Sequence, residues 1–151
     1  MRIHIGTDHA AFELKEDLKA RLIEAGYDVV DHGALTYDPD DDYTEFILPA
    51  AQAVADEPGS LGIVLGGSGN GEQIAANKVK GIRAALCFST ELAVLARQHN
   101  NANVISLGGR FVDHDQAWEI VKTFLSTEFT GEARHARRIE KLCAHEDQAF
   151  A

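Results

Sequence analysis

Short apolar runs alternate with helical patterns along the whole of this 151-residue chain. Five such runs lie at 2–6, 27–33, 61–67, 82–87 and 103–109, and a segment with helical character follows each of them. A helix between successive strands is what a crossover connection between parallel strands requires. The runs are apolar throughout, as in strands that are buried on both faces. The sequence therefore predicts an α/β fold: a three-layer αβα sandwich around a five-stranded parallel sheet, Rossmann-like or flavodoxin-like.

The expected helices follow from apolar spacing and from turn residues. Leu14, Leu18 and Leu22 are spaced four apart among charged residues, and Gly26 closes this helix. Further helices are expected at about 46–56, 72–78, 90–98 and 115–126, and a last one at about 132–149. Because no repeat, low-complexity tract or linker interrupts the pattern, we expect a single domain over residues 1–151.

Composition excludes several classes of partner. The formal net charge of −10 argues against nucleic acid, whose recognition depends on basic surface. No apolar run approaches the roughly 20 residues that span a bilayer, and no basic-then-apolar leader precedes the first strand. Cys87 and Cys143 have no metal-ligand spacing, which is typical of reduced thiols. We therefore expect a cytoplasmic protein without a nucleic-acid or membrane partner.

Unusual residues follow three of the predicted strands at their carboxyl ends. Asp8 and His9 come after the first strand, a glycine-rich loop after the third, and Gly109-Arg110 after the fifth. In open parallel sheets, ligands bind outside the carboxyl ends of the strands. The sequence therefore indicates a ligand site at this edge, although the fold alone does not identify the ligand.

The loop GGSGNGE (66–72) suits the binding of an anion. It is not a P-loop, because no Lys-Ser/Thr pair follows its last glycine, and its glycine spacing is too compressed for a dinucleotide fingerprint. Glycines allow several backbone N–H groups to turn toward one point, and the following helix adds its positive end. The loop could hold a phosphate or the oxyanion of an enolate-like intermediate.

Glu72 distinguishes between these two anions. A carboxylate in the first turn of a helix is a favourable structural choice by itself. Beside a bound phosphate it would repel the ligand, whereas beside a carbon acid it is a natural proton abstractor. Partial desolvation would bring its pKa closer to the working pH. Glycine amides next to a carboxylate therefore suggest proton abstraction alpha to a carbonyl.

Six segments in order carry a resemblance to a known family. They are GTDHAAFELK, DHG, DDDY, GGSGNGEQIAANKVKGIRAALC, ARQHNNANVISLGGR and RHARRIEKL. Together they cover essentially the whole chain, which resembles the type B ribose-5-phosphate isomerases and their relatives, the galactose-6-phosphate isomerase subunits. Some members of that family carry a cysteine base at the position of Gly66. The chain is therefore similar to the subgroup in which the glutamate at position 72 is the base. Thr44 departs from the proline that often follows the tyrosine, which affects only the loop conformation.

The resemblance implies an aldose–ketose isomerase, an intramolecular oxidoreductase that acts on sugar phosphates. It implies that Glu72 moves the carbon-bound proton. It also implies an anion hole made by the amides of Gly67, Ser68, Gly69, Asn70 and Gly71. The Ser68 hydroxyl both donates and accepts, so it suits a relay between O1 and O2 and equally suits a turn.

Further roles follow from the same resemblance. His99 would protonate the ring oxygen near neutral pH, although a histidine at a helix C-terminus also serves as a cap. Asp8 is either a helix N-cap or a partner in ring opening and a ligand for a sugar hydroxyl. Tyr43 and Asn100 are expected to contact sugar hydroxyls or the oxyanion.

Binding the phosphate group of a sugar phosphate requires positively charged side chains. Arg134 and Arg138 lie four apart and so share one face of a helix, where two guanidinium groups can grip a phosphate. The resemblance adds His9 and Arg110 to this set. The alternative for the arginines is ion pairing with the abundant acidic residues. Asp8, His9 and Glu13 do not predict a metal site, because only His9 and Glu13 have helical spacing, and the family implies neither metal nor cofactor.

The resemblance also implies an assembly. It implies a homodimer, or a tetramer of two such dimers, with the active site shared between subunits and the helix at 132–149 packed on a partner. The leading hypothesis is a ribose-5-phosphate isomerase of the pentose phosphate pathway. One alternative is an isomerase of a hexose or tetrose phosphate. Another is a non-catalytic phosphate- or nucleotide-binding module, which would have no use for Glu72 and His99 together.

Overall fold

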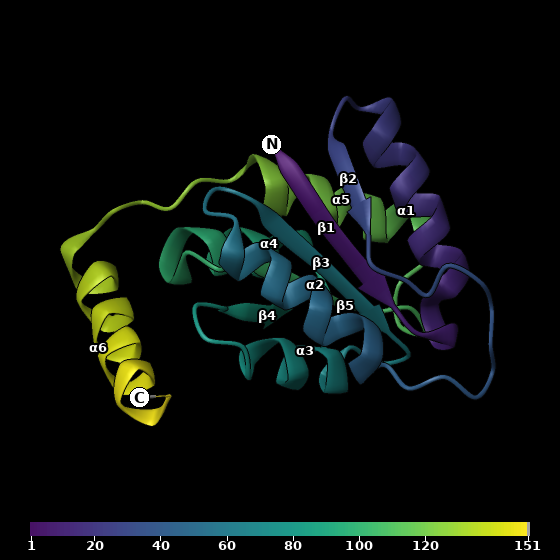
Figure 1. Cartoon of the computed structure of the whole chain (residues 1–151). Helices are drawn as coiled ribbons and strands as arrows, with labels where there is room; N and C mark the ends of the chain where they lie inside the picture. Colours follow the sequence, from purple (N-terminus) through teal and green to yellow (C-terminus); the bar gives the residue numbers. More distant parts are fainter. Residues whose placement is uncertain (151) are drawn as a thin grey trace.

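The computed structural model describes residues 1–150, which form five strands and six α-helices (Figure 1). The elements in order are β1 (Arg2–Thr7), a 3-10 turn η1 (His9–Ala11), α1 (Phe12–Glu24), β2 (Asp28–Asp31), α2 (Thr44–Asp56), β3 (Leu61–Gly66), α3 (Asn70–Asn77), β4 (Ala84–Leu86), α4 (Thr90–Asn100), β5 (Val104–Gly108), α5 (His114–Ser126) and α6 (Ala133–Ala149). None of the helices described is long and apolar enough to cross a membrane.

The strands form one parallel sheet in the order β2-β1-β3-β5-β4. This confirms the predicted fold class. The chain moves from β1 to β2 on one side and then returns to place β3 on the other side of β1. Crevices for ligands form at such a reversal, outside the carboxyl ends of the two strands. Here these are the ends of β1 and β3.

Helices cover both faces of the sheet, and each face has its own apolar core (Figure 1). Alternation along the strands divides the side chains: Ile63 and Leu65 face α1, α4 and α5, whereas Val64 faces α2 and α3. Helix α2 lies close to the sheet because Gly6 has no side chain. A Cβ at this position would lie only 3.0 Å from the Phe46 carbonyl oxygen. The result is the expected three-layer arrangement.

Several boundaries differ from the expected ones. Helix α3 begins at Asn70 rather than at Glu72, because Gly69 takes a left-handed conformation (φ 84°) and caps it. The second strand ends at Asp31, where the Asp31 carboxylate accepts a hydrogen bond from the Gly33 N–H and turns the chain. Helix α2 begins at Thr44, β4 has only three residues, and the turn η1 was not expected.

A buried lysine ties the segment after β2 to the body of the domain. The Lys15 side chain is fully buried, and its Nζ donates to both Asp31 oxygens, at 3.0 and 2.8 Å, and to the Ala34 carbonyl. The same segment bonds to the end of β1 through the N–H of Thr7, which donates to Gly33, and the N–H of Ala34, which donates to Thr7. These contacts fix the start of the loop that leads to α2.

Helix α6 (yellow) stands at one end of the molecule after an extended segment (Figure 1). It is attached at both of its ends: His135 stacks on His99 of α4, and Glu146 accepts a hydrogen bond from the Gly81 N–H. Leu142 and Phe150 remain 57% and 51% exposed. Most of the surface of α6 is therefore uncovered in a single chain.

Candidate active site

The carboxyl ends of β1, β3 and β5 bring together most of the predicted site residues. Asp8 and His9 follow β1, residues 67–72 follow β3, which ends at Gly66, and Arg110 follows β5. Tyr43 joins them from the start of α2. We call Asp8, His9, Tyr43, residues 66–72 and Arg110 the carboxyl-edge cluster.

The glycine loop turns its amides away from the sheet. The first hydrogen bond of α3 runs from the Gln73 N–H to the Gly69 carbonyl, so the earlier amides are outside the helical pattern. Within residues 1–150, the N–H groups of Gly67, Ser68, Gly69 and Gly71 donate to no protein acceptor. The Asn70 N–H instead donates to the Ser68 hydroxyl at 3.3 Å, so Ser68 stabilises the turn, one of the two roles expected for it. The loop can therefore offer its free amides to an anion.

The loop itself is held rigidly by its own carbonyl groups. The carbonyl of Gly66 accepts from the Gly109 N–H at 2.8 Å, and that of Gly67 accepts from the Arg110 N–H at 3.0 Å. The buried Ser106 hydroxyl donates to the Gly69 carbonyl at 2.8 Å. Since the carbonyls are bound toward β5, the N–H groups of the same peptides face the other way. This is the preorganisation that an oxyanion hole requires.

Glu72 lies in the first turn of α3 and is only 5% exposed. Burial raises the pKa of Glu72, a hydrogen bond from its own backbone N–H lowers it, and the nearby Asp8 carboxylate raises it again. In the part of the chain that the structure describes, no other residue donates a hydrogen bond to this carboxylate. A carboxylate with few donors and an elevated pKa is suited to accept a proton.

Gly66 makes the position of Glu72 possible. A side chain at residue 66 would overlap Oε1 and the carboxylate carbon of Glu72 and would lie 2.6 Å from Oε2. The Glu72 carboxylate therefore occupies the place of a side chain at position 66. A side chain at position 66 and the Glu72 carboxylate in this place therefore exclude one another.

Tyr43 and Arg110 border the loop at close range. A Cβ on Gly71 would lie 2.9 Å from Cζ of Tyr43, so the tyrosine ring rests against the first turn of α3. A Cβ on Gly67 would lie 3.0 Å from Cζ of Arg110. The phenol and the guanidinium thus approach the loop because glycines leave room for them.

Asp8 and His9 form a hydrogen-bonded cluster with Asp41, a residue that the sequence did not single out. Asp8 caps η1 by accepting from the Ala10 N–H at 3.0 Å, the cap role that was weighed for it. Asp41 accepts from the His9 N–H at 3.1 Å and lies 2.7 Å from His9 Nδ1. Glu13, the third residue of the metal site rejected above, is absent from this group, whose ligand atoms lie within 4.8 Å of one another. Because these atoms already bond to each other or to the backbone, we describe the group as a hydrogen-bonded cluster.

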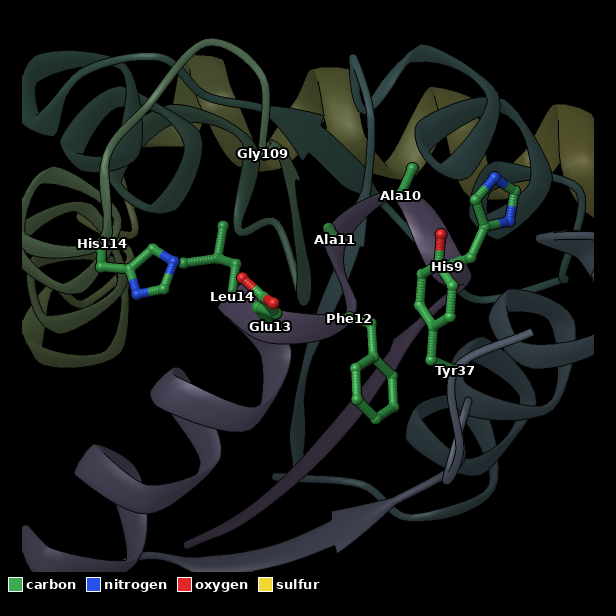
Figure 2. A pocket seen from close by; sticks show the side chains of 9 residues that line it. All are labelled: His9, Ala10, Ala11, Phe12, Glu13, Leu14, Tyr37, Gly109 and His114. Atoms are coloured by element: carbon green, nitrogen blue, oxygen red, sulfur yellow. The ribbon is translucent and has the colours of Figure 1, made fainter. Parts of the chain in front are cut away.

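A cavity of about 370 Å³ opens beside this cluster (Figure 2). His9 and His114 lie at its opposite ends, with Glu13 between them, and Tyr37 and Phe12 form one side. Gly109, next to Arg110, also lines it. The predicted phosphate residue His9 therefore borders open space, and Arg110 directly follows a residue that lines it.

The other predicted residues lie at the opposite edge of the sheet. His99 and Asn100 end α4, and the Asn100 carbonyl accepts from Arg83 Nε at 2.9 Å, close to where β4 begins. The length of β5, at about 3.3 Å per residue, separates this edge from the carboxyl-edge cluster by roughly 13 Å. One chain does not bring His99 to Glu72.

Arg134 and Arg138 accompany His99 rather than the glycine loop. Both are exposed on the first turns of α6, where Arg134 Nε lies 3.1 Å from Glu132 Oε2. Between them His135 stacks on His99 with ring centroids 4.3 Å apart, and burial and the neighbouring His99 lower the pKa of His135. We call His99, Asn100, Arg134 and Arg138 the α4–α6 cluster.

Comparison with known proteins shows the family to which the chain belongs. The family model described as Ribose/Galactose Isomerase matches residues 3–142. A curated relative named ribose-5-phosphate isomerase B, from Mycolicibacterium paratuberculosis, is 52% identical over 97% of this chain and 92% of its own length.

Solved structures show the same similarity. The crystal structure of ribose-5-phosphate isomerase B from Mycoplasma genitalium with bound ribulose-5-phosphate superimposes with a TM-score of 0.93 at 42% identity, covering 97% of this chain and 96% of that one. The Clostridium thermocellum enzyme gives a TM-score of 0.92 at 42% identity, with 99% of each chain covered. With its family model matched over nearly the whole length and its glycine loop and glutamate in place, the chain belongs to the Ribose/Galactose Isomerase family.

Proposed function

We propose that this protein is a ribose-5-phosphate isomerase, which interconverts D-ribose 5-phosphate and D-ribulose 5-phosphate. The observation that carries the proposal is the buried Glu72 carboxylate, which lies beside free loop amides at the N-terminus of α3. A base next to an anion hole is what an enediolate intermediate requires. The names of the relatives support the choice of a pentose phosphate. The proposal includes a place in the pentose phosphate pathway and in the cytoplasm.

The geometry fits the steps of this reaction. Glu72 takes the proton from C2 of the open-chain aldose and returns it to C1, while the loop amides stabilise the charge on the enediolate oxygens. Ser68 lies on the same loop, and because its hydroxyl both donates and accepts, we assign to it a proton relay between O1 and O2. Asp8, which is 8% exposed and close enough to Glu72 to raise its pKa, is placed to contact the sugar hydroxyls. His9 and Arg110 bind the phosphate group.

We propose further that the complete active site forms between two chains. The α4–α6 cluster holds the ring-opening histidine and two phosphate-binding arginines, yet it lies at the far edge of the sheet from Glu72. A two-fold symmetric dimer can place this cluster of one subunit against the carboxyl-edge cluster of the other. The exposed surface of α6, including Leu142, is then available to pack on the partner.

Mixing two inactive variants should restore activity if the site is shared. Glu72→Gln removes the base from one cluster, and His99→Asn removes the ring-opening acid from the other. In mixed dimers, one of the two sites then has neither substitution. With random assortment, half of the dimers are mixed, so about a quarter of wild-type activity should return before separation. Purified mixed dimers, with one intact site of two, should show about half of wild-type activity. The variants are co-expressed with different tags, and mixed dimers are purified and assayed. A mixed dimer as inactive as either parent would contradict the shared site.

A substrate panel tests the proposed function itself. Purified protein is assayed with ribose 5-phosphate and with hexose and tetrose aldose phosphates, in the presence of a chelator. We expect kcat/KM for the pentose phosphate to exceed that for the others by at least about tenfold, since a sugar chain that is one CHOH unit shorter or longer leaves polar groups unpaired. A preference for a hexose phosphate would assign another isomerase of the same chemistry. No turnover of any sugar phosphate would contradict the proposal.

A further inference from the structure

We propose that Asp41 is a positioning residue that holds His9 in its protonated form and directs its free N–H to the substrate phosphate. The inference rests on the proposed function, because it assigns to His9 a phosphate ligand at that site. Asp41 belongs to the acidic loop before α2, and its only described side-chain contacts are to His9. It touches none of the residues that carry out the proton transfer.

The contact fixes the imidazole at two points. Asp41 Oδ1 accepts from the His9 backbone N–H at 3.1 Å and lies 2.7 Å from Nδ1 of the same residue. A carboxylate oxygen accepts only, so Nδ1 carries a proton in this contact. The other ring nitrogen, Nε2, is then the atom left for a ligand, and it binds an anion only as an N–H donor. The imidazole must carry protons on both nitrogens to serve as a phosphate ligand.

The burial of Asp41 indicates that its charge matters and not only its shape. Its side chain is 6% exposed, and Oδ2 is buried without a hydrogen-bond partner among the described residues. An asparagine could accept the same two hydrogen bonds through one oxygen. Burying a carboxylate with an unpaired oxygen is costly unless a cation compensates for it. The available cation in contact is a protonated His9.

Other charged groups around His9 act in both directions. The Asp41 hydrogen bond raises the pKa of His9 most, burial opposes it, and the charges of Asp8 and Asp41 raise it further. Arg110, across the site on the β5–α5 loop, lowers it. The Tyr37 ring also faces the His9 ring edge-on, with the ring centroids 6.4 Å apart. Without Asp41, the histidine would face Arg110 and lose its charge at a lower pH.

Asp41→Asn tests the inference because it keeps the shape and removes the charge. In the free protein, the NMR titration of His9 should move to lower pH. KM for ribose 5-phosphate should rise about tenfold at neutral pH, as expected for a lost charge-assisted hydrogen bond, with kcat nearly unchanged. Well below both His9 pKa values the KM ratio of variant to wild type should return toward one, because both imidazoles are then charged. Well above both pKa values the KM ratio should again approach one, because neither imidazole is then charged.

Matched variants separate this role from a structural one. Asp40→Asn removes an exposed charge from the neighbouring position of the same loop and should leave KM and the His9 titration unchanged. His9→Asn should raise KM by itself, and adding Asp41→Asn to it should raise KM no further. An unchanged His9 titration, or a fall in kcat with KM constant at every pH, would overturn the inference. If no pentose phosphate is turned over, the proposed function fails, while the His9 titration and its response to inorganic phosphate still decide the role of Asp41.

Discussion

Glu72→Gln is expected to lower kcat for ribose 5-phosphate by roughly 10³-fold, with KM changed by less than about threefold. Glutamine keeps the length of the side chain and its place in the first turn of α3, so the substrate still finds the same loop and the same cations. It cannot accept the proton from carbon. The measurement is steady-state kinetics, together with exchange of the C2 proton in deuterated water, which should stop in the variant.

The pH profile gives a second readout of the same residue. Since burial raises the pKa of Glu72, wild-type activity should fall on the acid side at a pH above the ordinary glutamate value of 4.5, as the carboxylate gains its proton. A raised carboxyl pKa means that ionisation costs the folded state stability as the pH rises. Removing the charge should therefore leave the Tm unchanged or higher.

Glu91→Gln makes the same substitution in the first turn of α4, at an exposed position, and should keep full activity. A Glu72→Gln variant with more than a tenth of wild-type kcat would remove the base assignment.

Much of the fold could be predicted because it depends on local patterns. Continuous apolar runs predict strands buried on both faces, as found in β1, β3 and β5. The four-residue spacing of leucines predicts the buried side of α1. The ends of helices and strands could be predicted less exactly where the backbone conformation of a single residue determines them. Gly69 moves the start of α3 by two residues through its left-handed φ, which a glycine permits but does not require.

The site could be predicted in part, for a similar reason. Residues at the ends of parallel strands meet at one edge whatever the details, so Asp8, Glu72 and Arg110 were expected together. Asp41 was not found because it stands in a run of acidic residues, and only the folded loop selects one of them. The separation of His99 from Glu72 depends on the direction in which α4 runs back along the sheet, which the spacing of residues in a motif does not specify.

Gly66→Ala is expected to lower kcat by about 10²-fold or more, although it adds only one methyl group. That group would occupy the position of the Glu72 carboxylate, so the acid must rotate away from the substrate. A displacement of about 1 Å at a catalytic group can cost this much. The residue lies in β3 without a left-handed φ, so the backbone itself accepts alanine. Kinetics and a crystal structure of the variant would show the lost turnover and the moved carboxylate.

A second glycine of the same strand supplies the control. A Cβ on Gly62 would lie 2.9 Å from Val54 and 3.0 Å from Val104, inside the core under α2 and far from the loop. Gly62→Ala should therefore lower the free energy of unfolding by about 1–3 kcal/mol through overpacking, and the Tm should fall with it. The folded fraction should keep its kcat. Gly66→Ala should show the reverse: a small change in Tm and a large change in kcat. If Gly66→Ala keeps wild-type kcat, the carboxylate does not act from the position described, and the base must be sought elsewhere in the carboxyl-edge cluster.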